Sequence, residues 1–333
     1  MSPLIDTYGR SHRDLRVSLT DRCSLRCTYC MPHDFAAWLP SDHLLTTDEL
    51  LTVLEVGIAE GIEEVRLTGG EPLLRPDIVE IVRRISQLSN APKLSLTTNG
   101  LRLAELASPL ADAGLSRVNV SLDTLNWERF KKLTFRDRIE DVFKGLVAVR
   151  EAGLAPIKIN SVLMRGVNDD EAVELLTWAL REGFSLRFIE QMPLDAGGIW
   201  NRSTMVTADE MFAALSSKYS LTVVPTRGSA PAEEFYVDGG PETVGIIASV
   251  TRPFCGSCDR LRLTSDGQLR SCLFSLEEMD LRKVLRSESL ALGEIREEIR
   301  GRFQKTVIGK LPGHGINDPS FIQPSRPMSA IGG

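Results

Sequence analysis

The sequence of 333 residues has few cysteines and few aromatic side chains, with six Cys and 6% Phe, Trp and Tyr. No apolar run approaches the ~20 residues of a membrane-spanning helix, and residues 1–16 hold no apolar segment typical of a secretory signal. We therefore expect a cytoplasmic protein without a membrane anchor. The sequence also has no excess of basic residues. The 39 Lys and Arg face 45 Asp and Glu, and this net charge of −6 argues against a general nucleic-acid-binding protein.

The cysteines are distributed very unevenly along the chain. They form two groups of three, which we call the first and second cysteine groups: Cys23, Cys27 and Cys30, then Cys255, Cys258 and Cys272. In a reducing compartment, clustered cysteines bind metal more often than they form disulfides. The length, with 42% hydrophobic residues, allows one large domain or two.

Short β-rich runs alternate with helical stretches through the first two thirds of the chain. A capping box from Thr46 to Glu49 opens one helix, and apolar residues at helical spacing over 139–149 mark another, which ends at Gly153. Such alternation predicts βαβ units and a parallel sheet. The predicted strands are 15–20, 65–68, 94–98, 118–123, 157–163 and 186–192.

Within these strands, apolar and polar side chains alternate, as in Leu15-Arg16-Val17-Ser18. Parallel strands that protein covers on both faces are normally apolar throughout, so the polar face should line a wet or liganded space. We therefore predict an incomplete TIM-like (β/α)6 barrel, residues 1–217, around a polar lumen. An open sheet with one solvated face is the alternative.

After residue 217 the pattern changes to that of an α+β extension, predicted for residues 218–333. Segments 221–224, 235–237 and 244–250 are expected to be antiparallel strands, and a hairpin is expected to turn at 265–267. Helices are predicted at about 277–287 and 293–303, before a Gly- and Pro-rich tail.

The first cysteine group directly follows the first predicted strand. It should therefore lie at the mouth of the barrel where such folds keep their chemistry. Three thiolates can bind three irons of a 4Fe–4S cluster and leave the fourth iron open. A structural zinc site needs four ligands, and the nearest histidine, His33, completes no obvious zinc pattern.

The second cysteine group also lacks a fourth ligand nearby and predicts a second cluster with an open iron. A zinc knuckle with a distant fourth ligand, or three structural thiols, are the alternatives. Because Cys258 and Cys272 flank the predicted hairpin, strand pairing would bring them together.

Several cations fall on the polar face of the predicted strands. Arg16, Arg66 and Lys158 should face the lumen, and two more belong to the hairpin: Arg260 and Arg262. Buried cations need partners, and only Glu190 and Asp123 stand out as candidate carboxylates. The excess positive charge predicts a bound anion of several charges.

The pattern C-x3-C-x2-C with Tyr29 before its last cysteine resembles the radical S-adenosylmethionine (SAM) superfamily. The sequence Thr68-Gly-Gly-Glu-Pro72 resembles the SAM-contacting motif of that family, although a tight turn would also use these glycines. The resemblance implies a first 4Fe–4S cluster that binds and cleaves SAM. It further implies four cofactor contacts: Tyr29, Gly70, Ser121 and Met192.

A closer resemblance extends over nearly the whole chain. Segments 13–32, 66–72, 96–100, 119–123, 187–192, 254–262 and 331–333 together resemble the molybdenum cofactor biosynthesis protein A family, the GTP 3′,8-cyclases. The resemblance implies a lyase-type enzyme that converts GTP to 3′,8-cyclo-7,8-dihydro-GTP, the first step of molybdopterin biosynthesis. A SAM-derived radical would remove the ribose 3′ hydrogen, and the second cluster would bind the guanine edge.

By this resemblance the six cysteines hold two clusters and, in the first group, take part in catalysis. The implied GTP contacts are Arg16, Arg66, Thr97, Lys158, Arg260, Leu261 and Arg262. Implied partners are an electron donor such as flavodoxin or ferredoxin and the downstream cyclic pyranopterin monophosphate synthase, and a homodimer is allowed. A peptide-modifying radical SAM enzyme and a non-catalytic iron–sulfur electron carrier remain alternatives.

The tail ends in Ile331-Gly332-Gly333 and has no apolar periodicity. Composition alone favours a disordered end. Glycines can enter a narrow opening, however, and the terminal carboxylate would approach surplus cations. Family members also end in Gly-Gly. We therefore predict that Gly332 and Gly333 enter the barrel mouth and help to position catalytic groups, together with Arg260 and Arg262.

Overall fold

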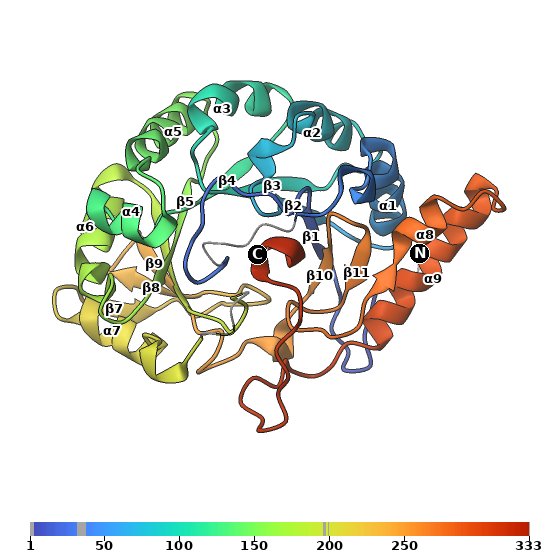
Figure 1. Cartoon of the computed structure of the whole chain (residues 1–333). Helices are drawn as coiled ribbons and strands as arrows, with labels where there is room; N and C mark the ends of the chain where they lie inside the picture. Colours follow the sequence, from blue (N-terminus) through green and yellow to red (C-terminus); the bar gives the residue numbers. More distant parts are fainter. Residues whose placement is uncertain (1–2, 32–37, 196–197, 199, 333) are drawn as a thin grey trace.

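A computed structural model describes residues 3–31, 38–195, 198 and 200–332 of the chain. Its strands form one sheet in the order β12-β11-β10-β1-β2-β3-β4-β5-β6-β9-β8-β7, which curls around the centre of the molecule with helices outside it (Figure 1). The strands predicted in the first two thirds are all present: β1 (Asp14–Ser18), β2 (Glu64–Thr68), β3 (Lys93–Thr98), β4 (Arg117–Ser121), β5 (Lys158–Leu163) and β6 (Ser185–Glu190).

The later strands join the same sheet at both of its edges. β9 pairs parallel with β6 and β10 pairs parallel with β1, so the parallel part of the sheet is wider than the six predicted strands. Antiparallel strands then extend each edge, as the sequence predicted for the hairpin of β10 and β11. The bounds are β7 (Leu221–Val223), β8 (Glu233–Val237), β9 (Thr243–Ile247), β10 (Arg260–Leu263), β11 (Gln268–Arg270) and β12 (Met279–Asp280).

The partial barrel is therefore confirmed, with one correction to its edges. Two segments expected only in antiparallel pairs each pair parallel with a barrel strand as well: segment 244–250, and the strand of the predicted hairpin that precedes its turn at 265–267. In the described part of the chain the sheet does not close, because β12 and β7 form its two edges. The sheet runs on across residue 217, and the boundary between 1–217 and 218–333 stays a prediction.

Helices cover the outer, apolar face of the sheet. Leu15 and Val17 of β1 are fully buried there. The capping box of Thr46 and Glu49 opens α1 as predicted, and Gly153 follows α5 with a φ of 71°. The helices are α1 (Thr47–Ala59), α2 (Ile78–Ser86), α3 (Leu103–Asp112), α4 (Trp127–Thr134), α5 (Ile139–Glu151), α6 (Ala172–Glu182), α7 (Ala208–Ser216), α8 (Leu281–Leu285), α9 (Leu292–Ile308) and α10 (Met328–Ile331).

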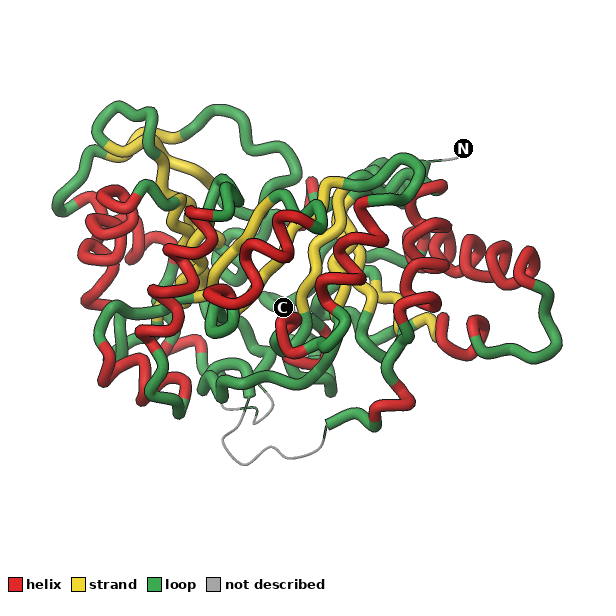
Figure 2. Tube along the Cα trace, turned by 90° about the horizontal axis from the view of Figure 1, so that it is seen from above, coloured by secondary structure: helices red, strands yellow, loops and turns green. Residues whose placement is uncertain are grey.

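The C-terminal end of the chain lies inside the ring of strands (Figure 1). Figure 2 shows loops and the short α10 gathered at one end of the strands, whereas α8 and α9 project to the side. None of the helices in the described ranges is long and apolar enough to cross a membrane.

Candidate active site

The first cysteine group lies in the loop that follows β1. This loop is held by the loop after β2, where Gly70 N–H donates to Thr20 O at 2.7 Å and Glu71 N–H donates to Arg22 O at 2.7 Å. A Cβ atom on Gly70 would lie 2.3 Å from Asp21 O and 2.4 Å from Arg22 O. The second glycine is therefore required for close contact between the two backbones.

Glu71 ties the same loop to the end of β3. Its buried carboxylate accepts hydrogen bonds from Thr98 Oγ1 at 2.7 Å and from the Asn99 N–H at 2.7 Å. Burial raises its pKa to about 6, against the effect of these donors. Asn99 in turn places its side-chain amide 3.8 Å from Cys23 Sγ. The Gly-Gly-Glu sequence thus shapes the loop that carries the cysteines.

Replacing Gly70 with Ala should displace the cysteine loop, because the new methyl group meets rigid backbone oxygens. We expect loss of about 1–3 kcal/mol of stability from overpacking and loss of iron from the first group, with iron at the second group retained. Gly293→Ala is the matched control, since nothing lies within 4 Å of that position. Iron analysis and thermal unfolding check this, and full iron in Gly70→Ala would contradict it.

The three thiols of the first cysteine group are partly buried and free of disulfides. Burial raises the pKa of Cys23 to about 11 and that of Cys30 to about 12, and in both cases a neighbouring negative charge adds to the shift. For Cys27, burial, Asp123 and both other cysteines raise the pKa well above its usual value. The raised pKa values mean that the thiolate forms are unfavourable here unless a positively charged group binds them. The iron atoms of an iron–sulfur cluster would supply that positive charge to all three.

The residues expected to contact SAM lie in this loop or just at the ends of other barrel strands. Tyr29 Oη donates to Asp123 Oδ2 at 2.8 Å, just beyond β4, and burial raises the pKa of Asp123 to about 6. Ser121 is the last residue of β4, and Gly70 follows β2. Met192 follows β6 and lines the cavity described next. Their contacts with SAM stay predictions.

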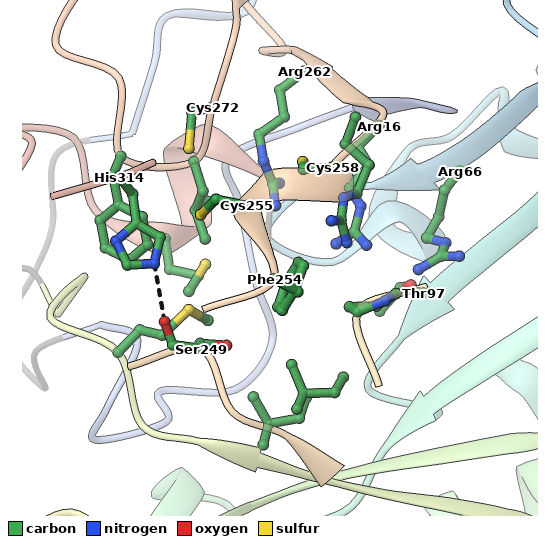
Figure 3. Close-up of a pocket in the computed structure, with 18 of the residues that line it drawn as sticks. Arg16, Arg66, Thr97, Ser249, Phe254, Cys255, Cys258, Arg262, Cys272 and His314 are labelled. Atoms are coloured by element: carbon green, nitrogen blue, oxygen red, sulfur yellow. Dashed lines mark hydrogen bonds between the residues drawn. The ribbon is translucent and has the colours of Figure 1, made fainter. Parts of the chain in front are cut away.

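A central cavity lies within the barrel, and five arginines line it: Arg16, Arg66, Arg187, Arg260 and Arg262. Arg16 pairs in register with Arg66 on one side and with Arg262 on the other, so the three form a row across β2, β1 and β10. Figure 3 shows Cys272 and Cys255 on one side of this cavity, Arg16 and Arg66 on the other, and Phe254 between them.

The described residues that line this cavity include no carboxylate. Burial, followed by repulsion from Arg66, lowers the pKa of Arg16 to about 9, and Arg16 Nε is buried without a hydrogen-bond partner. Arg260 stacks over the Phe254 ring at 4.6 Å and also keeps a buried nitrogen unpaired. Arg187 donates to Glu234 Oε1 at 2.9 Å, but the other four arginines form no ion pair within the described residues. The cavity therefore has an excess of positive charge and fits an anion.

The two carboxylates named as structural partners for these cations serve other groups. Glu190 accepts hydrogen bonds from the backbone N–H of Ala208 at 2.8 Å and of Val250 at 2.7 Å. Asp123 accepts from Tyr29 and, at 2.8 Å, from the Val162 N–H. Neither neutralises an arginine of the central cavity.

The second cysteine group lies in the wall of the same cavity. Cys255, Cys258 and Cys272 all line it and are free thiols. Burial raises the pKa of Cys258, but Arg260 and Lys310 outweigh this and lower it to about 7. No three His, Cys, Asp or Glu side chains of the described residues converge as ligands of one ion would. The donor set fits a cluster, whose thiolates bind separate irons, better than a single zinc ion. His33 lies outside the described residues.

Not every predicted GTP contact lies in this cavity. Thr97 lines it, but Lys158, at the start of β5, does not, and the Leu261 side chain is fully buried on the apolar face. Two further residues line the cavity that were not predicted as site residues: Arg187 and His314. Arg187 could have been found by extending the polar and apolar alternation into β6.

The tail contacts the first cysteine group and the ends of the neighbouring strands. The carbonyl of Gly332 accepts a hydrogen bond from Arg262, and a Cβ atom on Gly332 would lie 2.9 Å from the Ser18 Cβ and 3.1 Å from Thr68 Cγ2. The Ser329 N–H donates to the Cys30 sulfur, lowering a thiol pKa that burial raises. The tail is thus ordered through Gly332, while Gly333 lies outside the described residues.

Comparison with known proteins first defines the class. The Radical SAM superfamily profile matches residues 17–179, and the Molybdenum Cofactor Synthesis C profile matches residues 184–314. The crystal structure of Streptococcus suis SuiB has a TM-score of 0.60 at 13% identity and covers 96% of this chain and 77% of that one, which shows a shared fold. The protein is a radical SAM protein.

Curated relatives narrow this class. A GTP 3′,8-cyclase of Streptomyces coelicolor is 58% identical over 333 residues, covering 99% of this chain and 96% of the relative. A GTP 3′,8-cyclase of Mycobacterium marinum is 52% identical over 337 residues, covering 99% and 92%. The chain belongs to the GTP 3′,8-cyclase family.

Proposed function

We propose that this chain converts GTP to 3′,8-cyclo-7,8-dihydro-GTP with two 4Fe–4S clusters and SAM. The name GTP 3′,8-cyclase of its relatives supports the reaction, and the Radical SAM superfamily match and the two cysteine groups support the cofactors. One observation carries the proposal. A single cavity has the second cysteine group in its wall and five arginines around it, of which only Arg187 forms an ion pair with a carboxylate among the described residues. This arrangement can hold a nucleotide base near a cluster and its phosphates among the arginines.

The residues of the chain bind, orient and shield the substrate. The first cysteine group would hold a cluster at the mouth, and the second would hold one in the cavity wall. When bound, the first cluster and SAM supply a carbon-centred radical. The row of Arg262, Arg16 and Arg66 would fix the phosphates, and Phe254 offers an aromatic face beside it. The tail would cover the substrate near Gly332 and exclude water.

Arg16→Ala should weaken GTP binding by about tenfold or more, since a charge-assisted hydrogen bond is worth about 1.5–3 kcal/mol. Thermal unfolding without GTP should be unchanged or shifted upward, because the Arg16 cation is buried with an unpaired Nε. Calorimetry on the anaerobically reconstituted protein measures the first effect. Arg83→Ala, on the exposed face of α2, is the control that should alter neither.

Unchanged GTP affinity together with a large loss of stability would instead assign Arg16 to the fold. Product analysis after incubation with SAM and GTP tests the proposed reaction itself. Absence of the cyclised nucleotide from protein with two intact clusters would refute it. The free thiols fit a reducing cytoplasm. A flavodoxin or ferredoxin donor, delivery to the downstream synthase and a homodimer stay predictions.

A further inference from the structure

Lys310 is a buried lysine next to the second cysteine group. The residue is only 4% exposed. Its ammonium lies 3.5 Å from Cys258 Sγ and 2.6 Å from Arg260 O. Within the described residues Lys310 forms no ion pair with a carboxylate. The negative groups that act on it are the sulfurs of Cys258 and Cys272, while Arg10 and Arg260 add positive charge nearby.

The substrate does not explain this lysine. The residues that line the central cavity include Cys258 but not Lys310, which faces a second cavity on the other side of the cysteine group. A phosphate among the arginines would therefore not be its partner. A buried ammonium is costly unless it is paired, so the thiolate is the group that compensates it.

The fold fixes the ammonium in place from two directions. On one side is α9, which buries Phe303 and Val307 in the core. The Lys310 N–H donates to Val307 O at 3.1 Å, and this bond fixes Lys310 at the end of the helix. On the other side, Arg10 donates to Leu311 O at 2.8 Å and to Cys255 O at 2.7 Å, which joins the Lys310 segment to the cysteine loop. Asp6 holds Arg10 at 2.5 Å.

We propose that Lys310 raises the reduction potential of the second cluster, because its ammonium is a fixed positive charge beside the Cys258 sulfur. Hydrogen bonds to ligand sulfurs and local charge set cluster potentials over a wide range. One-electron reduction adds a negative charge to the cluster, and a nearby cation stabilises that reduced state. Lys310 is thus a positioning residue that acts through Cys258. The inference rests on the proposed second cluster, but not on turnover of GTP.

The test is a potentiometric titration of the full-length reconstituted protein, followed by electron paramagnetic resonance. The second-cluster signal is identified as the one that Cys272→Ala lacks. In Lys310→Gln we expect the ratio of reduced to oxidised second cluster at a fixed potential to fall about tenfold, or about 59 mV for one electron. The first cluster should not change. In Lys310→Arg the potential of the second cluster should stay close to that of the unmodified protein. In Lys305→Gln, a control exposed on α9, it should not change.

An unchanged potential in Lys310→Gln at full iron content would overturn the proposal. Loss of second-site iron from both Lys310→Gln and Lys310→Arg would also overturn it, since packing rather than charge would then matter. Loss from Lys310→Gln alone would support it, because the charge would already be needed by the oxidised cluster. A shifted potential without any cyclised product would leave this inference standing and refute only the proposed reaction.

Discussion

Replacing Cys23, Cys27 and Cys30 together with Ala should halve the iron content and abolish SAM cleavage. The reconstituted protein should contain about eight irons, four for each cluster. Burial raises the pKa of all three thiols, and nearby negative groups add to the shift: Glu71 at Cys23, Asp123 and the other two cysteines at Cys27, and Cys23 at Cys30. Without a cluster the thiols therefore gain nothing from lying together. Removing them should therefore leave thermal unfolding of the iron-free protein nearly unchanged.

The matched variant replaces Cys255, Cys258 and Cys272 with Ala. It should also hold about four irons, yet it should retain some SAM cleavage that is not coupled to cyclisation, because the first site stays intact. Iron assays and detection of 5′-deoxyadenosine distinguish the two variants. Four irons in the unmodified protein, with zinc at the second group, would contradict the two-cluster interpretation.

Local signals made much of the fold predictable. Thr46 and Glu49 form the capping box that opens α1, and the alternation in β1 put Leu15 against the helices and Arg16 in the cavity. These features depend on neighbours within a few residues. The turn between β10 and β11 was also predictable from local sequence. It contains Gly267, whose φ of 81° is in the region that favours glycine.

Contacts between distant segments were not predictable in this way. β10 pairs in parallel with β1, more than two hundred residues earlier, and this pairing completes the row of arginines. The sequence assigned Arg262 to a separate hairpin, so the in-register row of cations was not foreseen. Lys310 was overlooked because nothing in its neighbourhood along the chain indicates a sulfur partner.

The tail illustrates the same limit, because its composition favours disorder whereas distant residues hold it. Arg326, just before α10, donates to Asp266 Oδ2 at 2.9 Å and to Glu278 Oε2 at 2.9 Å. Asp266 belongs to the turn after β10, and Glu278 also accepts a hydrogen bond from the buried Arg270. This network anchors the tail a few residues before Gly332 meets Arg262.

Deleting Gly332 and Gly333 should leave both clusters and SAM cleavage nearly intact while the yield of cyclised product falls at least tenfold. The expected loss follows from the removed acceptor, because a hydrogen bond to a charged donor is worth about 1.5–3 kcal/mol. Gly332→Val should act similarly, since Gly332 has a φ of 86° and lies tightly against Ser18. Product and 5′-deoxyadenosine are measured in the same reaction.

Arg326→Ala separates anchoring from the chemistry of Gly332, because it releases the tail without altering its end. We expect an intermediate loss of product and faster proteolysis of the tail, with iron unchanged. Ile322→Ser, exposed in the same segment, is the control that should change neither. Because the tail contacts Cys30 through Ser329 and Arg262 through Gly332, its release should uncouple SAM cleavage from cyclisation rather than stop both. Full product from the truncated chain would show that Arg262 positions the substrate without help from the tail.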